Sequence, residues 1–266
     1  MKSERFAGLH GGWVIGIGLL VLATAASAKP VRITVKNVAP ADGVRITPLW
    51  FGIHDGSFDT FDPGSPASMG LERLAEDGDP SVISGAFAGA AQGVVFGPVT
   101  APGQPPIYHP GESGSVILDV DPSSDLYLSF LSMVIPSNDA FIGNPDPTAW
   151  QISSGGSLLP LTIDVYGSTV WDAGTEFNDE IPMNTPLLGQ MAPNTGVPQG
   201  GTVQLHGGFL PAGNVLSAFP GADFTASNYR VAQIDVVPIP EPASLLLVSI
   251  GAAAVGLRRR SILKSQ

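Results

Sequence analysis

The stretch Val31-Arg32-Ile33-Thr34-Val35-Lys36 alternates apolar and polar side chains with a period of two. This alternation is typical of a β-strand that has one face in a core and the other in solvent. Residues 229–237, near the other end of the chain, have a similar pattern. We expect both stretches to be strands that pair at the edge of one sheet.

The composition extends this prediction to an all-β domain. With 33 Gly, 25 Pro and 13% charged residues, the chain is interrupted too often for long helices. Five further stretches bounded by Gly, Pro, Asn and Asp are predicted strands: residues 47–53, 115–120, 126–135, 158–166 and 201–205. One short helix is expected over residues 66–76, with Pro66 in its first turn and Gly78 after its end. Residues 184–201 read as a long surface loop. The sequence therefore predicts an antiparallel β-sandwich with one short helix.

The N-terminus has the pattern of a secretory signal peptide. Lys2 and Arg5 precede an apolar stretch, and Ala26-Ser27-Ala28 forms an A-x-A cleavage site. We expect residues 1–28 to be removed by cleavage before Lys29, in an export pathway.

The C-terminus combines Pro240-Glu241-Pro242, an apolar run over residues 243–257 and Arg258-Arg259-Arg260. This tail resembles the PEP-CTERM sorting signal of Gram-negative bacteria, which implies processing by a membrane enzyme of the exosortase type and release to the surface or the extracellular polymer. Basic residues after an apolar run indicate a cytoplasmic end. A helix of the 15 apolar residues would be about 22 Å long, against a hydrocarbon core of roughly 30 Å. This favours transient contact with the inner membrane, with a permanent anchor as the alternative.

The net charge of the mature chain limits the classes of partner that it can bind. Between Lys29 and Pro242 there are 6 basic and 22 acidic residues, a net charge of −16. Such a field repels phosphate backbones and attracts cations, so nucleic acid is not an expected partner. The chain has no cysteine, so its fold must depend on an apolar core. The length of the mature chain suits one all-β domain, with two small domains as the alternative.

Residues 31–237 resemble a bacterial spondin domain. The resemblance is carried, in order, by Pro48-Leu49-Trp50 with His54-Asp55-Gly56-Ser57-Phe58, Gly70-Leu71-Glu72 with Leu74-Ala75-Glu76-Asp77-Gly78, Pro136-Ser137-Asn138-Asp139-Ala140-Phe141-Ile142-Gly143, Trp171-Asp172-Ala173-Gly174-Thr175-Glu176 and Asn228-Tyr229-Arg230-Val231-Ala232. It implies a C2-like antiparallel β-sandwich, an extracellular setting and a divalent cation, usually calcium. In animals this domain occurs in matrix adhesion proteins.

The resemblance also implies three acidic metal ligands. The Asp of the Pro-Ser-x-Asp turn matches Asp139, and the Asp of the Asp-Ala-Gly-Thr motif matches Asp172. A carboxylate on the preceding strand best matches Asp119, with Asp121 as the fallback.

General chemistry supports a hard cation at such a site. Calcium takes six to eight oxygen ligands, which carboxylates, carbonyls and water can supply. His10, His54, His109 and His206 have no zinc-binding spacing, and Cys is absent, so zinc is disfavoured. The alternative for Asp139 and Asp172 is that each caps a local Asx turn.

An enzymatic interpretation has weaker support. Glu176, Asp179 and Glu180 could form a glycosidase-like carboxylate pair, but they lie in a polar stretch typical of a solvated loop or a second metal shell. His54 could belong to a catalytic triad, but the sequence has no motif that marks a nucleophile. We therefore expect His54 to have a structural role at a strand end. Trp50, Trp150 and Trp171 could line a sugar-binding face, although a core position is favoured. Glu76-Asp77-Gly78-Asp79 reads as a solvated turn.

Together these patterns predict an exported, non-enzymatic protein in three parts: a signal peptide over residues 1–28, a spondin-like domain over 29–238 and a sorting signal over 239–266. The predicted role is calcium-dependent binding or a structural function at the cell surface or in the extracellular matrix. Its expected partners are the processing enzyme and an extracellular polysaccharide or surface protein. The alternative is a secreted hydrolase that acts on polysaccharide.

Overall fold

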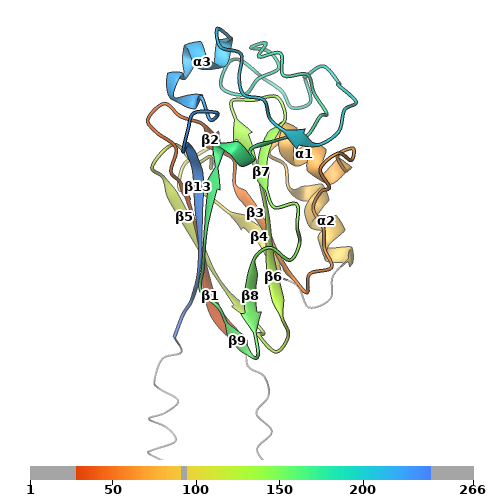
Figure 1. The fold of residues 1–266 in the computed structure, drawn as a ribbon, viewed down its shortest axis with the longest axis vertical. Coiled ribbons are helices and arrows are strands. Elements are labelled where there is room, and N and C mark those ends of the chain that lie inside the picture. The colour runs from red at the N-terminus through yellow and green to blue at the C-terminus, as the bar shows by residue number, and fades with distance from the viewer. Residues whose placement is uncertain (1–27, 91–94, 241–266) are drawn as a thin grey trace, which may run out of the picture.

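The computed structural model describes residues 28–90 and 95–240. The predicted signal peptide, its cleavage site, the apolar segment 243–257 and most of the sorting motif, including Glu241, Pro242 and Arg258 to Arg260, lie outside the described residues. The described part is mostly β, with two antiparallel sheets and a few short helices (Figure 1). Within it, no helix is both long and apolar enough to cross a membrane.

The smaller sheet has four strands in the order β10-β13-β1-β5. These are β1 (Lys29–Asn37), β5 (Ser113–Val120), β10 (Leu161–Tyr166) and β13 (Arg230–Pro238). The predicted pairing of the two alternating stretches is confirmed, because β1 and β13 are antiparallel neighbours with Val31 opposite Pro238. Their predicted edge position is wrong. Both strands are interior, since β5 covers β1 and β10 covers β13.

The larger sheet has nine strands, with β12-β11-β7-β6-β3-β4 as its main path. Its longest members are β3 (Leu49–His54), β4 (Val95–Val99) and β6 (Leu126–Ile135), as predicted for two of the three. The shorter ones are β2 (Arg45–Ile46), β7 (Ala140–Gly143), β8 (Gln151–Ser154), β9 (Ser157–Leu158), β11 (Trp171–Asp172) and β12 (Gln204–Leu205). The predicted strand over residues 158–166 is divided into β9 and β10, because Pro160 lies between them and cannot donate to a ladder.

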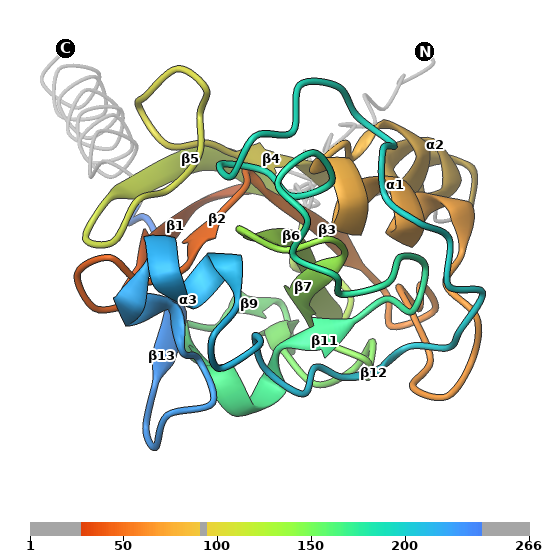
Figure 2. The same cartoon turned by 90° about the horizontal axis from the view of Figure 1, so that it is seen from above.

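One apolar core lies between the two sheets. It takes Ile33 of β1, Ile163 of β10 and Ile234 of β13 from the smaller sheet, and Phe51 of β3, Leu128 of β6 and Ile142 of β7 from the larger. Side chains of alternate residues point to opposite faces of a strand, so the inward-facing residues of both sheets meet in this layer. Figure 2 shows the strands of the two sheets from above. The C2-like topology remains a prediction.

Helices cover the outer face of the larger sheet. α1 (Met69–Asp77) and α2 (Ser81–Ala90) pack beside each other next to β3, β4 and β6, and α3 (Asn214–Ala218) lies at the top of Figure 1. Two 3-10 turns, η1 (Gly167–Thr169) and η2 (Pro220–Ala222), complete the elements. The second core beneath α1 and α2 includes Trp50, Leu131 and Phe141. This explains why β6 is an almost continuous apolar run: it is buried on both faces.

The prediction of one helix was wrong in number and only partly right in bounds. α1 begins after Ser68, whose side chain accepts the Leu71 N–H, and Pro66 lies before it. Gly78 ends α1 in the left-handed conformation, as expected. α2 was missed because its Gly85 and Gly89 suggest a turn, yet Ile83 and Phe87, one helical turn apart, are both buried.

β6 runs along the length of the domain and connects its two ends. β1 begins and β13 ends at the lower end in Figure 1, where Ile239 N–H still donates to the Pro30 carbonyl. β6 starts at that end, after the turn over residues 121–125, and runs to the upper end, where residues 136–139 lead into β7. The motifs around Asp139 and Asp172 therefore lie at the end away from both described termini.

Candidate cation site

The structure brings Asp139 and Asp172 together. Asp139 lies just before β7, and Asp172 ends β11, which pairs with β7 so that Asp172 is opposite Ala140. The Ala173 N–H donates to the Asp139 backbone carbonyl at 3.2 Å. Asp139 is completely buried and Asp172 is 5% exposed. Two carboxylates far apart in sequence thus meet in a protected place.

The two carboxylate oxygens of Asp139 differ in their hydrogen bonding. Its Oδ2 accepts three hydrogen bonds, from Thr175 N at 2.8 Å, Thr175 Oγ1 at 3.1 Å and Glu176 N at 3.1 Å. Its Oδ1 is buried and has no hydrogen-bond partner. Burial, followed by the negative charge of Asp172, raises the pKa of Asp139 to about 6, against the hydrogen bonds, which lower it. A buried, unpaired carboxylate oxygen requires an explanation.

Asp172 is held from both sides. Its Oδ1 accepts from Gly174 N at 2.7 Å and its Oδ2 from Asn178 Nδ2 at 2.9 Å. The Asn178 side-chain oxygen in turn lies 3.1 Å from His206 Nε2. Because His206 Nδ1 accepts from Gly208 N, the neutral ring carries its proton on Nε2 and donates it to Asn178. Burial lowers the pKa of His206, which agrees with this neutral form.

The Asx-turn alternative applies to one of the two residues. The bond from Gly174 N to Asp172 spans two residues and is such a turn. The Asp139 carboxylate instead holds Thr175 and Glu176, 36 and 37 residues away. Its hydrogen bonds therefore fix the segment after β11 to the end of β6 and do not cap a local turn.

Two glutamates face the same cluster: Glu76, which the sequence analysis did not assign to a site, and Glu176, for which a second metal shell was one alternative. Glu76 and Glu176 are each 4% exposed, and Glu76 Oε2 is buried without a partner. Burial raises the pKa of Glu76, and the charges of Glu72, Asp77 and Asp139 add to this. Burial, followed by the charge of Glu76, raises the pKa of Glu176 to about 7. Both side chains line a cavity of about 300 Å³ between α1 and the segment after β11.

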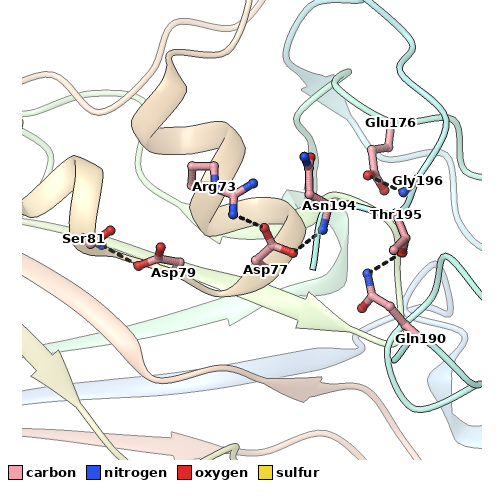
Figure 3. Close-up of polar contacts among 9 residues, drawn as sticks. All are labelled: Arg73, Asp77, Asp79, Ser81, Glu176, Gln190, Asn194, Thr195 and Gly196. Atoms are coloured by element: carbon pink, nitrogen blue, oxygen red, sulfur yellow. Dashed lines mark hydrogen bonds and ion pairs between the residues drawn. The ribbon is translucent and has the colours of Figure 1, made fainter. Parts of the chain in front are cut away.

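The predicted solvated turn at residues 76–79 is therefore wrong for Glu76 and Asp77. Both belong to α1, and Asp77 forms an ion pair with Arg73 at 2.8 Å (Figure 3). Asp77 Oδ1 also accepts the Asn194 N–H at 3.0 Å, and Glu176 Oε1 accepts the Gly196 N–H at 2.9 Å. These carboxylates fix the 190–196 segment against α1. The spacing of α1 gives no signal for the burial of Glu76, because a residue five positions after Leu71 and two after Leu74 lies on another face of the helix.

Asp119 and Asp121 lie at the other end of the molecule. Asp119 is exposed on β5 opposite Pro30, and Asp121 is exposed in the turn before β6. β6 has ten residues, so about 30 Å of strand separates this turn from the connection that holds Asp139. The structure does not bring either residue to Asp139 and Asp172. Across residues 28–90 and 95–240, no three His, Cys, Asp or Glu side chains are already gathered as a metal-binding group. The metal role of Asp139 and Asp172 stays a prediction.

The carboxylates of Asp179 and Glu180, two candidates for a catalytic pair, accept hydrogen bonds from neighbouring backbone and side-chain groups. Glu180 is buried, with Oε1 accepting from Leu210 N at 2.6 Å and Oε2 from Val215 N at 3.0 Å. Asp179 accepts from Ile181 N and from Asn184 Nδ2. A solvated loop is wrong for Glu176 and Glu180, because the fold buries both. The other predicted role, a second metal shell, stays a prediction.

His54 and Trp50 are structural, as expected. His54 ends β3, accepts from Gly56 N and lies 2.9 Å from Ser129 Oγ. Trp50 is fully buried and its indole N–H donates to Ser84. Trp150 and Trp171 are only partly buried and line a separate cavity.

Two family models match the chain. The Spondin_N family model matches residues 39–179, more than half of the chain, and this match includes Asp139 and Asp172. The model of the PEP-CTERM protein-sorting motif matches residues 238–260. No curated protein matched the chain. The chain thus belongs to the Spondin_N family and carries a C-terminal PEP-CTERM sorting motif, which identifies it as an exported spondin-domain protein.

Proposed function

We propose that this protein is a calcium-dependent binding or structural component of the cell surface or extracellular matrix, released there by an exosortase-type enzyme. Its partner would be an extracellular polysaccharide or a surface protein. The calcium would be held at the upper end of the domain by Asp139 and Asp172, together with Glu76. The observation that supports this most directly is the buried, unpartnered Oδ1 of Asp139.

The residues present fit a hard cation. Asp139 Oδ1 and Glu76 Oε2 are buried oxygens without hydrogen-bond partners. Thr175 lies between them, because its backbone N–H donates to Asp139 and its hydroxyl lowers the pKa of Glu76. The neighbouring donors are oxygens of carboxylates and backbone, which are calcium ligands, and the chain has no cysteine.

The electrostatics favour the same ligand. The buried carboxylates raise one another's pKa, so the cluster is unfavourable when ionised. Calcium at this position would supply two positive charges and complete the ligand sphere with oxygen atoms. Neighbouring groups orient the two carboxylates: Thr175 and the Glu176 N–H hold Asp139, and Asn178 holds Asp172.

Calcium should raise the melting temperature of the purified protein. A ligand at 100 times its Kd stabilises the native state by about 2.7 kcal/mol. This corresponds to roughly 5–11 °C for a domain of about 200 residues. The measurement is calorimetric titration followed by thermal melting in calcium and in chelator.

The Asp139→Ala, Asp172→Ala double variant should lose the heat of binding and the shift. The exposed Asp125→Ala variant, at the other end, should keep both. A wild-type protein that neither binds calcium nor shifts would show that these carboxylates only stabilise the fold.

Replacing Pro240, Glu241 and Pro242 together by alanine should block sorting. The processing enzyme would no longer read the motif, so we expect full-length protein to accumulate in the membrane fraction and the released form to fall several-fold. Immunoblotting of membrane and medium fractions measures this. Wild-type protein in cells lacking the enzyme should give the same pattern. Normal release of the alanine variant would contradict the assignment.

A further inference from the structure

A second cavity lies on the side of the molecule where the two sheets separate. Its volume is about 380 Å³, and its walls are mainly apolar. Ile163 and Tyr166 of β10 contribute from the smaller sheet, and Phe130 of β6 and Trp171 of β11 from the larger. Trp150, in the connection before β8, closes it on one side. Volumes of 300–1,000 Å³ with aromatic walls are typical of small-molecule sites.

The indole N–H groups of Trp150 and Trp171 form no hydrogen bond within the described part of the protein. Both Nε1 atoms are buried. An indole N–H usually finds an acceptor when it is buried, as that of Trp50 does with Ser84. Both residues are otherwise only partly buried, which leaves ring surface available to a ligand. A fitting ligand therefore combines an apolar face with hydrogen-bond acceptors.

The same cavity also has carboxylates, which can accept hydrogen bonds from a ligand. Asp146 and Asp164 are among the lining residues, and because Asp164 forms an ion pair with Arg230, Asp146 is the carboxylate available to a ligand. Asp146 Oδ1 accepts from Thr148 N at 2.8 Å and from Thr148 Oγ1 at 2.7 Å, which lowers the pKa of Asp146 and keeps it an ionised acceptor. Carboxylates at the edge of an aromatic wall suit a ligand with several hydroxyl groups and disfavour an anion.

We propose that this cavity binds a neutral hexose unit of a polysaccharide chain. A pyranose ring has a C–H face that packs on indole and ring oxygens and hydroxyls that accept from the indole N–H groups. Its hydroxyls donate to Asp146. The net charge of −16 over residues 29–242 excludes uronic and other acidic sugars from preferred binding.

This site is distinct from the cation site. Trp171 and Asp172 are consecutive residues of β11, so their side chains point to opposite faces of the strand. Asp172 turns toward Asn178, whereas Trp171 lies against Phe61 with ring centroids 5.3 Å apart and lines the cavity. The inference rests on the proposed function, because it specifies the polysaccharide partner named there, and its site can be tested separately from the cation site.

The test is a tryptophan-fluorescence titration of the purified protein with neutral gluco-, galacto- and manno-oligosaccharides. We expect a saturable change with at least one of them, because two of the chain's four tryptophans line the cavity. Trp150→Ala should weaken binding at least tenfold. Trp171→Phe keeps an aromatic wall and removes only the N–H, so about a fivefold loss is expected for one hydrogen bond. Asp146→Asn should also weaken binding.

Controls separate this proposal from the other one. Phe177→Ala, an exposed aromatic on the loops of the upper end, should bind as wild type does. The titration is run in calcium and in chelator, with calcium binding measured separately by calorimetry, so that loss of the cation site is distinguished from loss of the saccharide site at Trp150. Absence of any response from folded wild-type protein, or equal affinity in Trp150→Ala, overturns the proposal. Binding of simple alcohols or hydrocarbons in place of oligosaccharides also overturns it.

Discussion

In the absence of divalent cations, protonation of Asp139 and Glu176 should stabilise the protein as the pH falls from about 7 to about 4. Asp139 has a pKa of about 6 in the folded protein against an ordinary value of 3.8, and Glu176 about 7 against 4.5. The folded state therefore holds protons that the unfolded state has released. Stability is fully present below the ordinary pKa values and is lost as the pH rises through the folded ones.

The size of this effect comes mainly from Asp139, which is fully buried. One pKa unit corresponds to about 1.36 kcal/mol, so we expect a loss of about 2–3 kcal/mol across the window from about pH 4 to 7. Exposed carboxylates with lowered pKa values, such as Asp55 and Asp146, titrate below this window. His54 and His206, whose pKa values burial lowers, oppose the effect within it, so the contribution of Asp139 and Glu176 is the difference between wild type and a variant that lacks both carboxylates. Urea unfolding in chelator at several pH values measures the slope.

Calcium supplies the control for the pH series. It competes with protons for the same carboxylates, so it should stabilise most at high pH and flatten or reverse the slope. The Asp139→Asn, Glu176→Gln double variant should also have a flatter profile in chelator. A pH profile in chelator that is the same for wild type and for this double variant would contradict the buried, mutually repelling cluster.

The sequence allowed most strands to be predicted, because their signal is local. Residues 126–135 coincide with β6, and residues 31–36 lie within β1. Apolar runs and period-two alternation reflect burial that each strand requires wherever it packs. The interior position of β1 was not predictable in this way, because a strand pattern says which face is buried and not which neighbours pair with it.

The site was half predictable for a similar reason. Asp139 and Asp172 lie in distinctive motifs that the family resemblance could align, and pairing of β7 with β11 brings them together. Glu76 comes from a helix more than sixty residues earlier in the chain and reaches the cluster only through packing of α1 on the larger sheet. In sequence it stands in an acidic run that is typical of solvent exposure. Only tertiary packing distinguishes it from its neighbours.

The glutamine variant of Glu76 should bind calcium about 10- to 100-fold more weakly than wild type, which is about 1.4–2.7 kcal/mol. Glutamine keeps the volume and one carbonyl oxygen of the side chain but removes its charge, and calcium affinity depends on the number of charged ligands. Without calcium, the same variant should be as stable as wild type or more so, because burial and neighbouring charges raise the pKa of Glu76 and oppose its ionisation. A purely structural role would not give this opposite pair of effects.

Asp119→Asn is the matched comparison, since it removes a charge from the residue that the family alignment suggests as the third ligand. Asp119 is exposed opposite Pro30 at the far end of the domain, so its variant should keep the wild-type affinity within twofold. Calorimetric titration of both variants decides between the two residues. A loss in Asp119→Asn with none in Glu76→Gln would restore the ligand set expected from sequence. Unchanged affinity in both would leave Asp139 and Asp172 as the only acidic ligands among the candidates.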